Sequence, residues 1–422
     1  MARPHETSEI RRTIDAVWRI EAAKVIATLA RMVGDLSAAE DLAQDALLEA
    51  LAKWPEQGIP RNPAAWLTAV GKRRAIDGWR RSQKLGEKYA LIATTTEPAP
   101  APDDVERLDE PQIDDDLLRL IFICCHPVLA PTSRAALALR ILCGLSTDEI
   151  ARAYLVPSAT MGQRITRAKR TLTAANVPFE LPARVEFASR LGDVYEVIYL
   201  VFNEGYSATA GDDWMRPELC ELAIRLGRVL ATLVPDQSEA HGLVALMELH
   251  ASRVGARSKA NGEPILLLEQ NRSRWDRLLI AHGLEQLRKA DALERPRGNY
   301  TLQAAIAACH ARAATPEQTD WAEIAALYEA LARLTESPVV ELNRAVAISM
   351  AYGPEAGLEI VEALTASGRL DGYHLLPSVR GDLLEKLGRR LEARTEFLRA
   401  AELTRNERER TVLLRRAADA VE

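Results

Sequence analysis

The sequence lacks the features that mark membrane and secreted proteins. No run approaches the roughly 18 uncharged apolar residues that span a bilayer, and the N-terminus has no basic and apolar leader. We therefore expect a cytoplasmic protein. Cysteine is also scarce: the five Cys form no disulfide framework, and the run Cys124, Cys125, His126 supplies no CxxC pair for zinc. These absences favour buried free thiols, and we expect no metal and no cofactor.

Net charge is small and negative, at −6 from 54 basic and 60 acidic residues. Taken alone, this value argues against a nucleic-acid binder. The charges are segregated, however. Residues 61–88 hold eight Lys or Arg and two acids, residues 97–116 hold nine acids and one Arg, and residues 158–172 hold four basic residues and no acid. Charge counted by segment therefore predicts two basic surfaces.

The apolar pattern predicts an all-α protein, because apolar residues recur at intervals of three and four and no strand pattern is evident. The chain of 422 residues is long enough for two or three domains. We expect a helical unit over 1–82, an acidic and Pro-rich flexible linker over 83–112, and a compact helical unit over 113–175. A helical middle domain over 176–315 and helical repeats over 316–422 complete the predicted organisation.

The repeats at the C-terminal end rest on an offset of 37 residues. Ala356, Ile360 and Ala363 recur as Ala393, Phe397 and Ala400, and the second copy adds Gly381, Leu384 and Gly388 at the spacing of a tetratricopeptide (TPR) helix pair. Small residues let two such helices approach, and the aromatic ring fills the gap between them. A TPR-like surface predicts a protein partner, and a purely structural helical lid is the alternative.

A helix-turn-helix is predicted at residues 146–172. Ser146 and Glu149 form a capping box, Pro157 breaks the first helix, and Ser158 is the expected cap of the second helix. An apolar stripe of Met161, Ile165, Ala168 and Leu172 would leave Gln163, Thr166, Arg167 and Arg170 on the solvent side. Glutamine and arginine can read base edges in the major groove, and an ordinary solvated helix face is the alternative.

The first unit carries two further features. Ser37 and Glu40 predict a second capping box, and the helix that follows presents a polar stripe of Asp41, Gln44, Asp45 and Leu48. Because Leu48 is apolar, this stripe suggests a docking face, whereas solvated charge is the plain alternative.

Asn62 and Pro63 then start a helix that contains "GKRRAIDGWRR" together with Trp66 and Trp79. Basic groups beside aromatic rings suit single-stranded or melting DNA. Burial in the core is the alternative, and the favoured one, for each Trp.

The order of these elements resembles the extracytoplasmic-function (ECF) group of the bacterial sigma-70 family. The resemblance rests on "EDLAQDALLEALAKW", "NPAAWLTAVGKRRAIDGWRR", the acidic linker and "GLSTDEIARAYLVPSATMGQRITRAKRTL". "YLVFNEGYSA", "QNRSRWDR" and "SPVVELNRAVA" are similar to the subgroup with a long TPR-like C-terminal extension. The resemblance implies sigma region 2 over 1–82, sigma region 4 over 113–175, and a linker that threads a basic channel of the polymerase.

The resemblance also implies roles for individual residues. Core RNA polymerase would be bound through Asp41, Gln44, Asp45 and Leu48. The −10 promoter element would be contacted by Arg61, Asn62, Trp66, Lys72, Arg73, Arg74, Arg80 and Arg81, and the −35 element by Ser158, Thr160, Gly162, Gln163, Arg164, Thr166, Arg167 and Arg170. Arg73 replaces an Asn that is common in the group, and Gly162 replaces a basic residue.

Two other functions would fit parts of the sequence. A conventional helix-turn-helix regulator with a sensing repeat domain would need a dimer and a near-palindromic operator, and it leaves the 61–81 basic segment unexplained. An enzyme in residues 176–315 could use Asn203, Glu204 and Tyr206 or the cluster from Glu269 and Arg272 to Arg274 and Asp276. No nucleophile–base pair, phosphate loop or metal spacing accompanies these residues. Turns and ion pairs between helices are therefore the expected roles, and we expect no enzyme.

Overall fold

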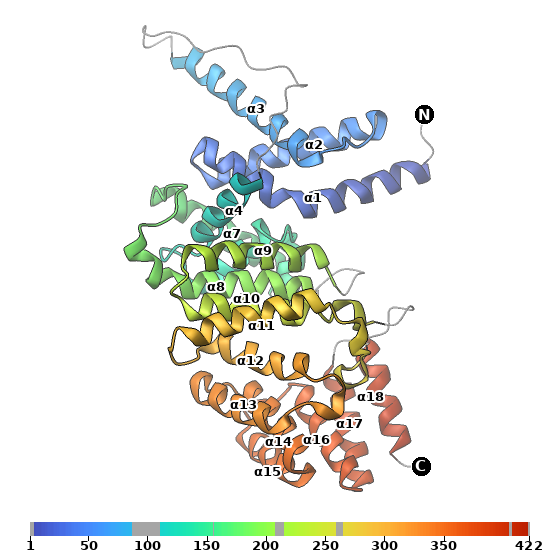
Figure 1. The fold of residues 1–422 in the computed structure, drawn as a ribbon. Helices are drawn as coiled ribbons and strands as arrows, with labels where there is room; N and C mark the ends of the chain where they lie inside the picture. The colour runs from blue at the N-terminus through green and yellow to red at the C-terminus, as the bar shows by residue number, and fades with distance from the viewer. Residues whose placement is uncertain are drawn as a thin grey trace. The chain divides into compact units, whose positions relative to one another are not determined.

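The computed structural model describes residues 4–86, 110–154, 156–206, 215–258, 265–404 and 407–420. Within these ranges the chain forms α-helices and short 3-10 helices and has no β-strand, so the all-α prediction is confirmed (Figure 1). Helices in the described part of the chain are each too short or too polar to cross a membrane. The chain divides into two compact units, Met1–Leu233 and Val234–Glu422.

The N-terminal unit begins with three helices that pack on one another and continues with six more. The first three are α1 (Pro4–Val33), α2 (Leu36–Gln57) and α3 (Pro63–Gly86). The next four are α4 (Glu110–Cys124), α5 (Pro131–Ile141), α6 (Thr147–Ala153) and α7 (Ser158–Ala174). The last two are α8 (Arg184–Tyr206) and α9 (Pro217–Leu233). Of the predicted linker, residues 83–86 belong to α3 and residues 110–112 to α4, and the rest lies outside the described residues.

Apolar side chains of α4 form the centre of this unit. Leu117, Leu118 and Ile121 have no exposed surface, and α4 contacts α1, α5, α8 and α9. Because α8 and α9 pack on α4, the compact unit extends well past residue 175. The segment expected as a middle domain, 176–315, is divided between the two units at Leu233.

Helix caps explain where these helices begin. The capping box at α6 is confirmed, because the Ser146 amide donates to Glu149 Oε2 at 2.7 Å and the Glu149 amide donates to Ser146 Oγ at 3.2 Å. Asn62 caps α3, as its Oδ1 accepts from the Ala65 amide at 3.0 Å. The predicted Ser37–Glu40 capping box is wrong. Asp35 caps α2 instead, through the Ala38 amide, and this shift of the cap by two residues places Glu40 inside the protein.

The capping box gives a first test of the fold. Ser146→Ala removes the hydroxyl that accepts from the Glu149 amide, and we expect it to lower the free energy of unfolding by about 1 kcal/mol. Urea unfolding followed by circular dichroism would measure the change. Thr132→Ala, at an exposed position in the first turn of α5, is the control and should change stability by less than about 0.5 kcal/mol. Equal effects of the two variants would contradict the role of the cap.

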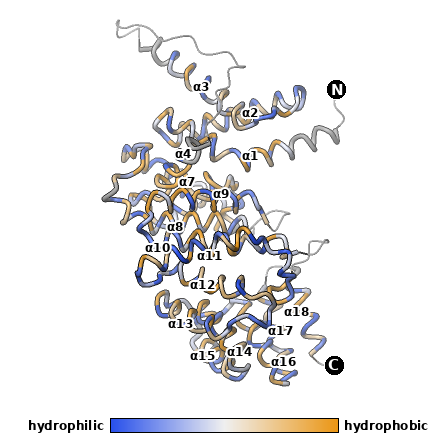
Figure 2. The backbone as a smooth tube through the Cα atoms, viewed as in Figure 1, coloured by the Kyte–Doolittle hydropathy of each residue, from blue (hydrophilic) through white to orange (hydrophobic). Residues whose placement is uncertain are grey.

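The C-terminal unit is a succession of helices in which each packs on its neighbours in the chain. They are α10 (Ser238–Ala251), α11 (Arg277–Ala292), α12 (Asn299–Arg312), α13 (Trp321–Thr335), α14 (Pro338–Tyr352), α15 (Pro354–Ser367), α16 (Leu375–Lys386), α17 (Arg390–Leu403) and α18 (Glu407–Asp419). Short 3-10 helices lie at Val254–Ala256, Leu267–Glu269, Arg272–Arg274 and Pro316–Gln318. Hydrophobic and hydrophilic residues alternate along these helices, as expected of amphipathic elements (Figure 2).

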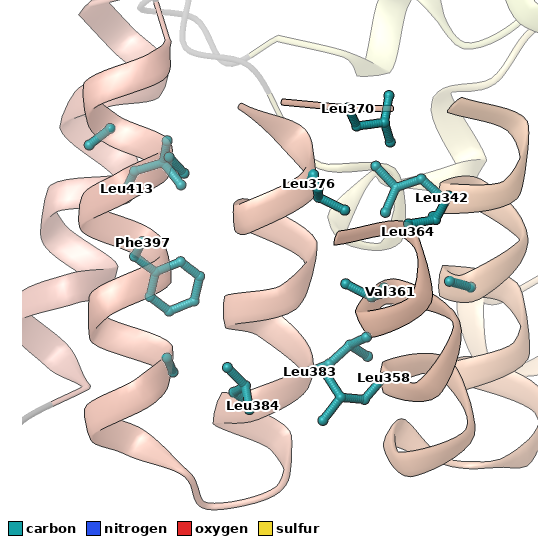
Figure 3. Packing of buried hydrophobic residues seen from close by; sticks show 14 of the residues in the cluster. Leu342, Leu358, Val361, Leu364, Leu370, Leu376, Leu383, Leu384, Phe397 and Leu413 are labelled. Atoms are coloured by element: carbon teal, nitrogen blue, oxygen red, sulfur yellow. The ribbon is translucent and has the colours of Figure 1, made fainter. Parts of the chain in front are cut away.

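The last helices share one apolar core. Leu358, Val361, Leu383, Leu384 and Phe397 are buried together between α15, α16 and α17 (Figure 3). The predicted close approach at Gly381 is confirmed, because a Cβ atom there would lie 2.7 Å from the Phe397 ring. The helix pairing and this contact agree with the expected repeat pattern, and the assignment of these helices to the TPR class stays a prediction.

Candidate nucleic-acid interface

The predicted helix-turn-helix is formed by α6 and α7, with Tyr154, Val156 and Pro157 among the residues between them. The apolar stripe of α7 is buried as predicted: Met161, Ile165, Ala168 and Leu172 are each at most 5% exposed. Gln163, Thr166, Arg167 and Arg170 are all exposed. One face of α7 therefore anchors the helix, and the other presents two guanidinium groups, an amide and a hydroxyl to solvent.

The start of α7 differs in detail from the prediction. Pro157 occupies the N-cap position without a side-chain bond, so Ser158 is the first helical residue and the cap predicted for it is wrong. Its hydroxyl donates to Asp148 on α6 instead, which ties the two helices together. Thr160 is exposed. A Cβ atom at Gly162 would lie 3.7 Å from the Thr147 side chain, which is an ordinary van der Waals contact.

Arg164 is less free than its neighbours on α7. Its guanidinium carbon lies 6.0 Å from the centre of the Tyr154 ring, and the side chain is half-buried. Of the −35 candidates, Arg164 is therefore held on the turn, whereas Arg167 and Arg170 project from the exposed face.

A buried carboxylate joins α7 to α2. Glu40 is only 3% exposed, and its carboxylate pairs with Lys169 of α7 and with Arg140 of α5, the latter at 3.4 Å. Next to it, Thr173 of α7 donates to the Asp35 carboxylate at 2.7 Å. Sequence reasoning missed this cluster. Its only signal was that Glu40 falls on the apolar stripe of α2 between Leu36 and Ala43, where an acid needs a buried partner.

The polar stripe of α2 is largely accessible. Asp41 is exposed and Leu48 is 63% exposed, which is unusual for a leucine on a packed helix. Gln44 is half-buried and donates to Glu40 Oε1 at 3.1 Å. Asp45 pairs with Arg74 of α3 at 3.1 Å. Asp41 and Leu48 are thus available for docking, while Gln44 and Asp45 also contribute to packing within the protein.

Two basic residues of α3, Arg73 and Arg74, are paired with acids of α2. Arg73 and Arg74 contact the Glu49 carboxylate at 2.9 and 3.2 Å, and Lys53 contacts it at 2.8 Å. Burial acts to raise the pKa of Glu49, but hydrogen bonds from Lys53 and Arg74 and the charges of Lys53 and Arg73 outweigh burial and lower this pKa below 4.5. Glu49 therefore stays charged at neutral pH and partly neutralises the basic surface. This contribution to stability is complete above about pH 4.5 and is lost as acid protonates the carboxylate.

Removing the Glu49 charge should strengthen binding of the free protein to DNA. We expect Glu49→Gln to tighten binding to random duplex about threefold to tenfold at low salt, because Arg73 and Arg74 lose a competing anion. Fluorescence anisotropy with a labelled duplex would measure the change. Glu285→Gln is the matched control, because the Glu285 carboxylate pairs with Arg288 at an exposed position of α11. An unchanged affinity for Glu49→Gln would contradict the proposed screening.

The remaining −10 candidates lie on α3 or just before it. Arg61 is exposed before α3, and Asn62 both caps α3 and remains exposed. Trp66 is half-buried and packs edge-on against Trp54 at 5.3 Å, so it is chiefly a core residue. Trp79 is 49% exposed, and the core position favoured for it is wrong. Lys72 is half-buried and Arg80 is exposed, and the side chain of Arg81 lies outside the described residues.

The thiols have structural roles. None of the five cysteines forms a disulfide, and all five are buried. Burial, with the nearby charge of Glu40, raises the pKa of Cys124 to about 12. His126 accepts a hydrogen bond from the Val128 amide. Among the residues that the structure describes, no group of three or more His, Cys, Asp or Glu could hold a metal ion.

The polar clusters considered for an enzyme are used in packing. Glu204 and Arg216 pair at 3.5 Å while both are buried. Arg272 is buried and donates to the carbonyls of His310 and Ala313 at 2.9 and 2.8 Å. Asp276 caps α11. Arg272 binds backbone carbonyls rather than the expected acid partner, and Asn203 is exposed.

Comparisons with known proteins match both regions that are predicted to contact DNA. The family model for sigma-70 region 2 matches residues 19–85, and the model for sigma-70 region 4 matches residues 119–172. A family of unknown function, DUF6596, matches residues 190–291. No solved structure matches the chain.

Two relatives extend these matches. An uncharacterised protein of Rhizobium meliloti (strain 1021) is 49% identical over 386 residues, which cover 91% of this chain and 90% of the relative. The probable ECF RNA polymerase sigma factor SigI of Mycobacterium tuberculosis is 27% identical over 164 residues, which cover 39% of this chain and 56% of SigI.

With both sigma regions in order and a helix-turn-helix in the second, the chain is a transcription initiation factor of the sigma class. It belongs to the extracytoplasmic-function group of the sigma-70 family, and it carries a C-terminal helical extension. Its partners are core RNA polymerase and promoter DNA.

Proposed function

We propose that this sigma factor reads its promoters with α3 and α7 while α2 holds it on core polymerase. Support comes chiefly from α7, which is anchored by four buried apolar residues and presents Gln163, Thr166, Arg167 and Arg170 on one exposed face. These side chains suit the major groove of a −35 element. Arg73, Arg74 and Arg80 would contact the −10 element, and Asp41 and Leu48 would dock on the polymerase.

In this proposal the polymerase carries out RNA synthesis, and the chain itself catalyses nothing. It works in the cytoplasm, where the polymerase works. Its negative net charge and the pairing of Arg73 and Arg74 with acids weaken binding of the free protein to random DNA. The linker over 83–112 would supply the reach between two promoter elements.

The free protein holds α7 against α2 through Glu40, Lys169, Asp35 and Thr173. The −10 and −35 elements are separate stretches of a promoter, so we infer that these contacts part when both regions engage DNA on the polymerase. Separating α7 from α2 then costs the free energy of these buried pairs. The free energy of binding to polymerase and promoter must exceed this cost.

Two substitutions on α7 test the promoter contacts. Gln163→Ala and Arg167→Ala should each reduce transcription from a cognate promoter about tenfold to a hundredfold, because a good base contact is worth about 1–3 kcal/mol. Run-off transcription with core polymerase measures the loss. Arg333→Ala, at a 73% exposed side chain of α13, is the control and should leave the output unchanged. A wild-type output for both α7 variants would remove α7 from promoter recognition.

For the C-terminal extension we propose regulation, through a bound partner or ligand. The structure indicates where to cut: a chain ending at Leu233 keeps α8 and α9, which pack on α4, whereas a cut at residue 175 would expose that core. Transcription by the chain ending at Leu233 would be compared with that of the full chain. Transcription would be measured with and without cell extract as a source of the partner or ligand. If the two chains give equal transcription under both conditions, the extension has no regulatory role.

A further inference from the structure

The C-terminal unit contains a cavity that none of the sigma-factor roles uses. Its volume is about 280 Å³, and it lies among the C-terminal end of α10, the residues that follow it, α12, α13 and α14. Aliphatic side chains form much of the wall, and six polar or titratable residues share it: His250, Arg253, Gln303, His310, Tyr328 and Asn343. A mixed wall of this kind, with a few convergent polar groups, is typical of a small-molecule site.

The charge of the cavity has one sign. Of the described residues that line it, Arg253 is the only Lys or Arg, and none is Asp or Glu. Arg253 is half-buried and lies over the Trp275 ring, with its guanidinium carbon 5.9 Å from the ring centre. No described carboxylate lies within ion-pairing distance of Arg253. A half-buried guanidinium that has an aromatic neighbour but no anion favours a negatively charged guest.

His310 supplies a second, independent indication. The residue is 8% exposed, it lines the cavity, and its Nδ1 atom has no hydrogen-bond partner. Nδ1 is itself buried and does not open onto the cavity, which leaves Nε2 as the ring nitrogen that a guest could reach. Burial and the charges of Arg253 and Arg272 lower the pKa of His310 to about 4, so at neutral pH the neutral ring has one N–H to donate.

The wall around His310 is fixed in place. Arg272 binds the His310 and Ala313 carbonyls and donates to Thr319 Oγ1 at 3.0 Å, which holds the C-terminal end of α12. The His310 ring also packs edge-on against Trp321 at 5.2 Å. A site held by such contacts needs little reorganisation to bind a ligand.

We propose that this cavity binds a small monocarboxylate with a short apolar body. Its carboxylate would lie at Arg253 and His310, and its apolar body would lie against Ile306, Leu331 and Val340. One guanidinium and aliphatic walls fit a single negative charge better than a phosphate dianion, which would carry a second charge without a cationic partner. Such a site would make the extension a ligand-sensing unit. Binding of a ligand in the cavity can be measured independently of promoter recognition.

The test uses the full-length chain and 4-fluorobenzoate, followed by fluorine NMR, with 4-fluorobenzamide as the neutral analogue and 4-fluorophenyl phosphate as the dianion. We expect 4-fluorobenzoate to bind with a Kd below about 10 mM, and each analogue to bind at least tenfold more weakly. Arg253→Gln should weaken binding of 4-fluorobenzoate at least tenfold, and Arg253→Lys should restore part of it. His310→Phe should weaken binding by a smaller factor.

The matched control is Arg288→Gln, which removes a guanidinium that is 69% exposed on α11 and lies outside the cavity. It should bind the probe as the wild-type chain does, and circular dichroism would confirm that each variant is folded. Three results would overturn the proposal: no binding of 4-fluorobenzoate, equal binding of the benzamide or the phosphate, or wild-type affinity in a folded Arg253→Gln chain.

Discussion

Replacing Leu48 with Arg is expected to reduce promoter-directed transcription about a hundredfold, which corresponds to roughly 2.7 kcal/mol of lost binding to core polymerase. Leu48 is 63% exposed on α2, in line with Asp41 and beside Asp45. A side chain at the centre of an interface is fully desolvated, and a guanidinium in place of the leucine would be buried there without a partner. Titration of core polymerase with the labelled chain measures the affinity directly.

The control for this substitution is Leu278→Arg, which places the same charge at an 83% exposed leucine of α11. It should bind polymerase as the wild-type chain does. Both positions are exposed, so neither change should alter the free energy of unfolding by more than about 0.5 kcal/mol. If Leu48→Arg binds polymerase with wild-type affinity, α2 is not the docking helix.

The second large effect is expected at Glu40. We expect Glu40→Gln to destabilise the N-terminal unit by about 3 kcal/mol, because the neutral amide leaves the Lys169 and Arg140 charges without their buried anion. The amide N–H groups would also face the Lys169 ammonium, which can only donate. Urea unfolding would measure the loss, and faster hydrogen exchange in α7 than in the wild-type chain would place it at the contact with α2.

Glu285→Gln serves as the control here, since its pair with Arg288 is exposed on α11 and should contribute less than about 1 kcal/mol. A double-mutant cycle of Glu40→Gln with Lys169→Gln isolates the pair. A coupling near zero would show that Glu40 does not hold α7. If the contact between α7 and α2 must part before the protein acts, the Glu40→Gln chain should also reach half-maximal transcription at a lower polymerase concentration.

Much of the fold follows from local sequence signals. The capping box of Ser146 and Glu149 depends on neighbouring residues only, and so does the start of α3 at Pro63 after Asn62. Both predictions are confirmed. Where two caps compete, sequence alone decides less well. Asp35 and Ser37 are both good N-cap residues, and Asp35 is selected because Leu36 and Glu40 are then both buried.

The candidate site was predictable to the extent that it depends on helical periodicity. The spacing of Met161, Ile165, Ala168 and Leu172 fixes which side of α7 faces solvent, and the structure agrees. Ion pairs between helices were not predictable, because they join residues far apart in the chain. Arg73 pairs with Glu49, and Lys169 pairs with Glu40, only after the helices pack.

The most direct test of the account is run-off transcription on genomic DNA, with the full chain added to core polymerase stripped of its own specificity subunit and the transcript 5′ ends sequenced. We predict discrete start sites, each preceded by shared −35 and −10 sequences, that core polymerase alone does not produce. A transcript pattern no different from that of core polymerase alone would contradict the claim that α2, α3 and α7 together direct the enzyme to promoters.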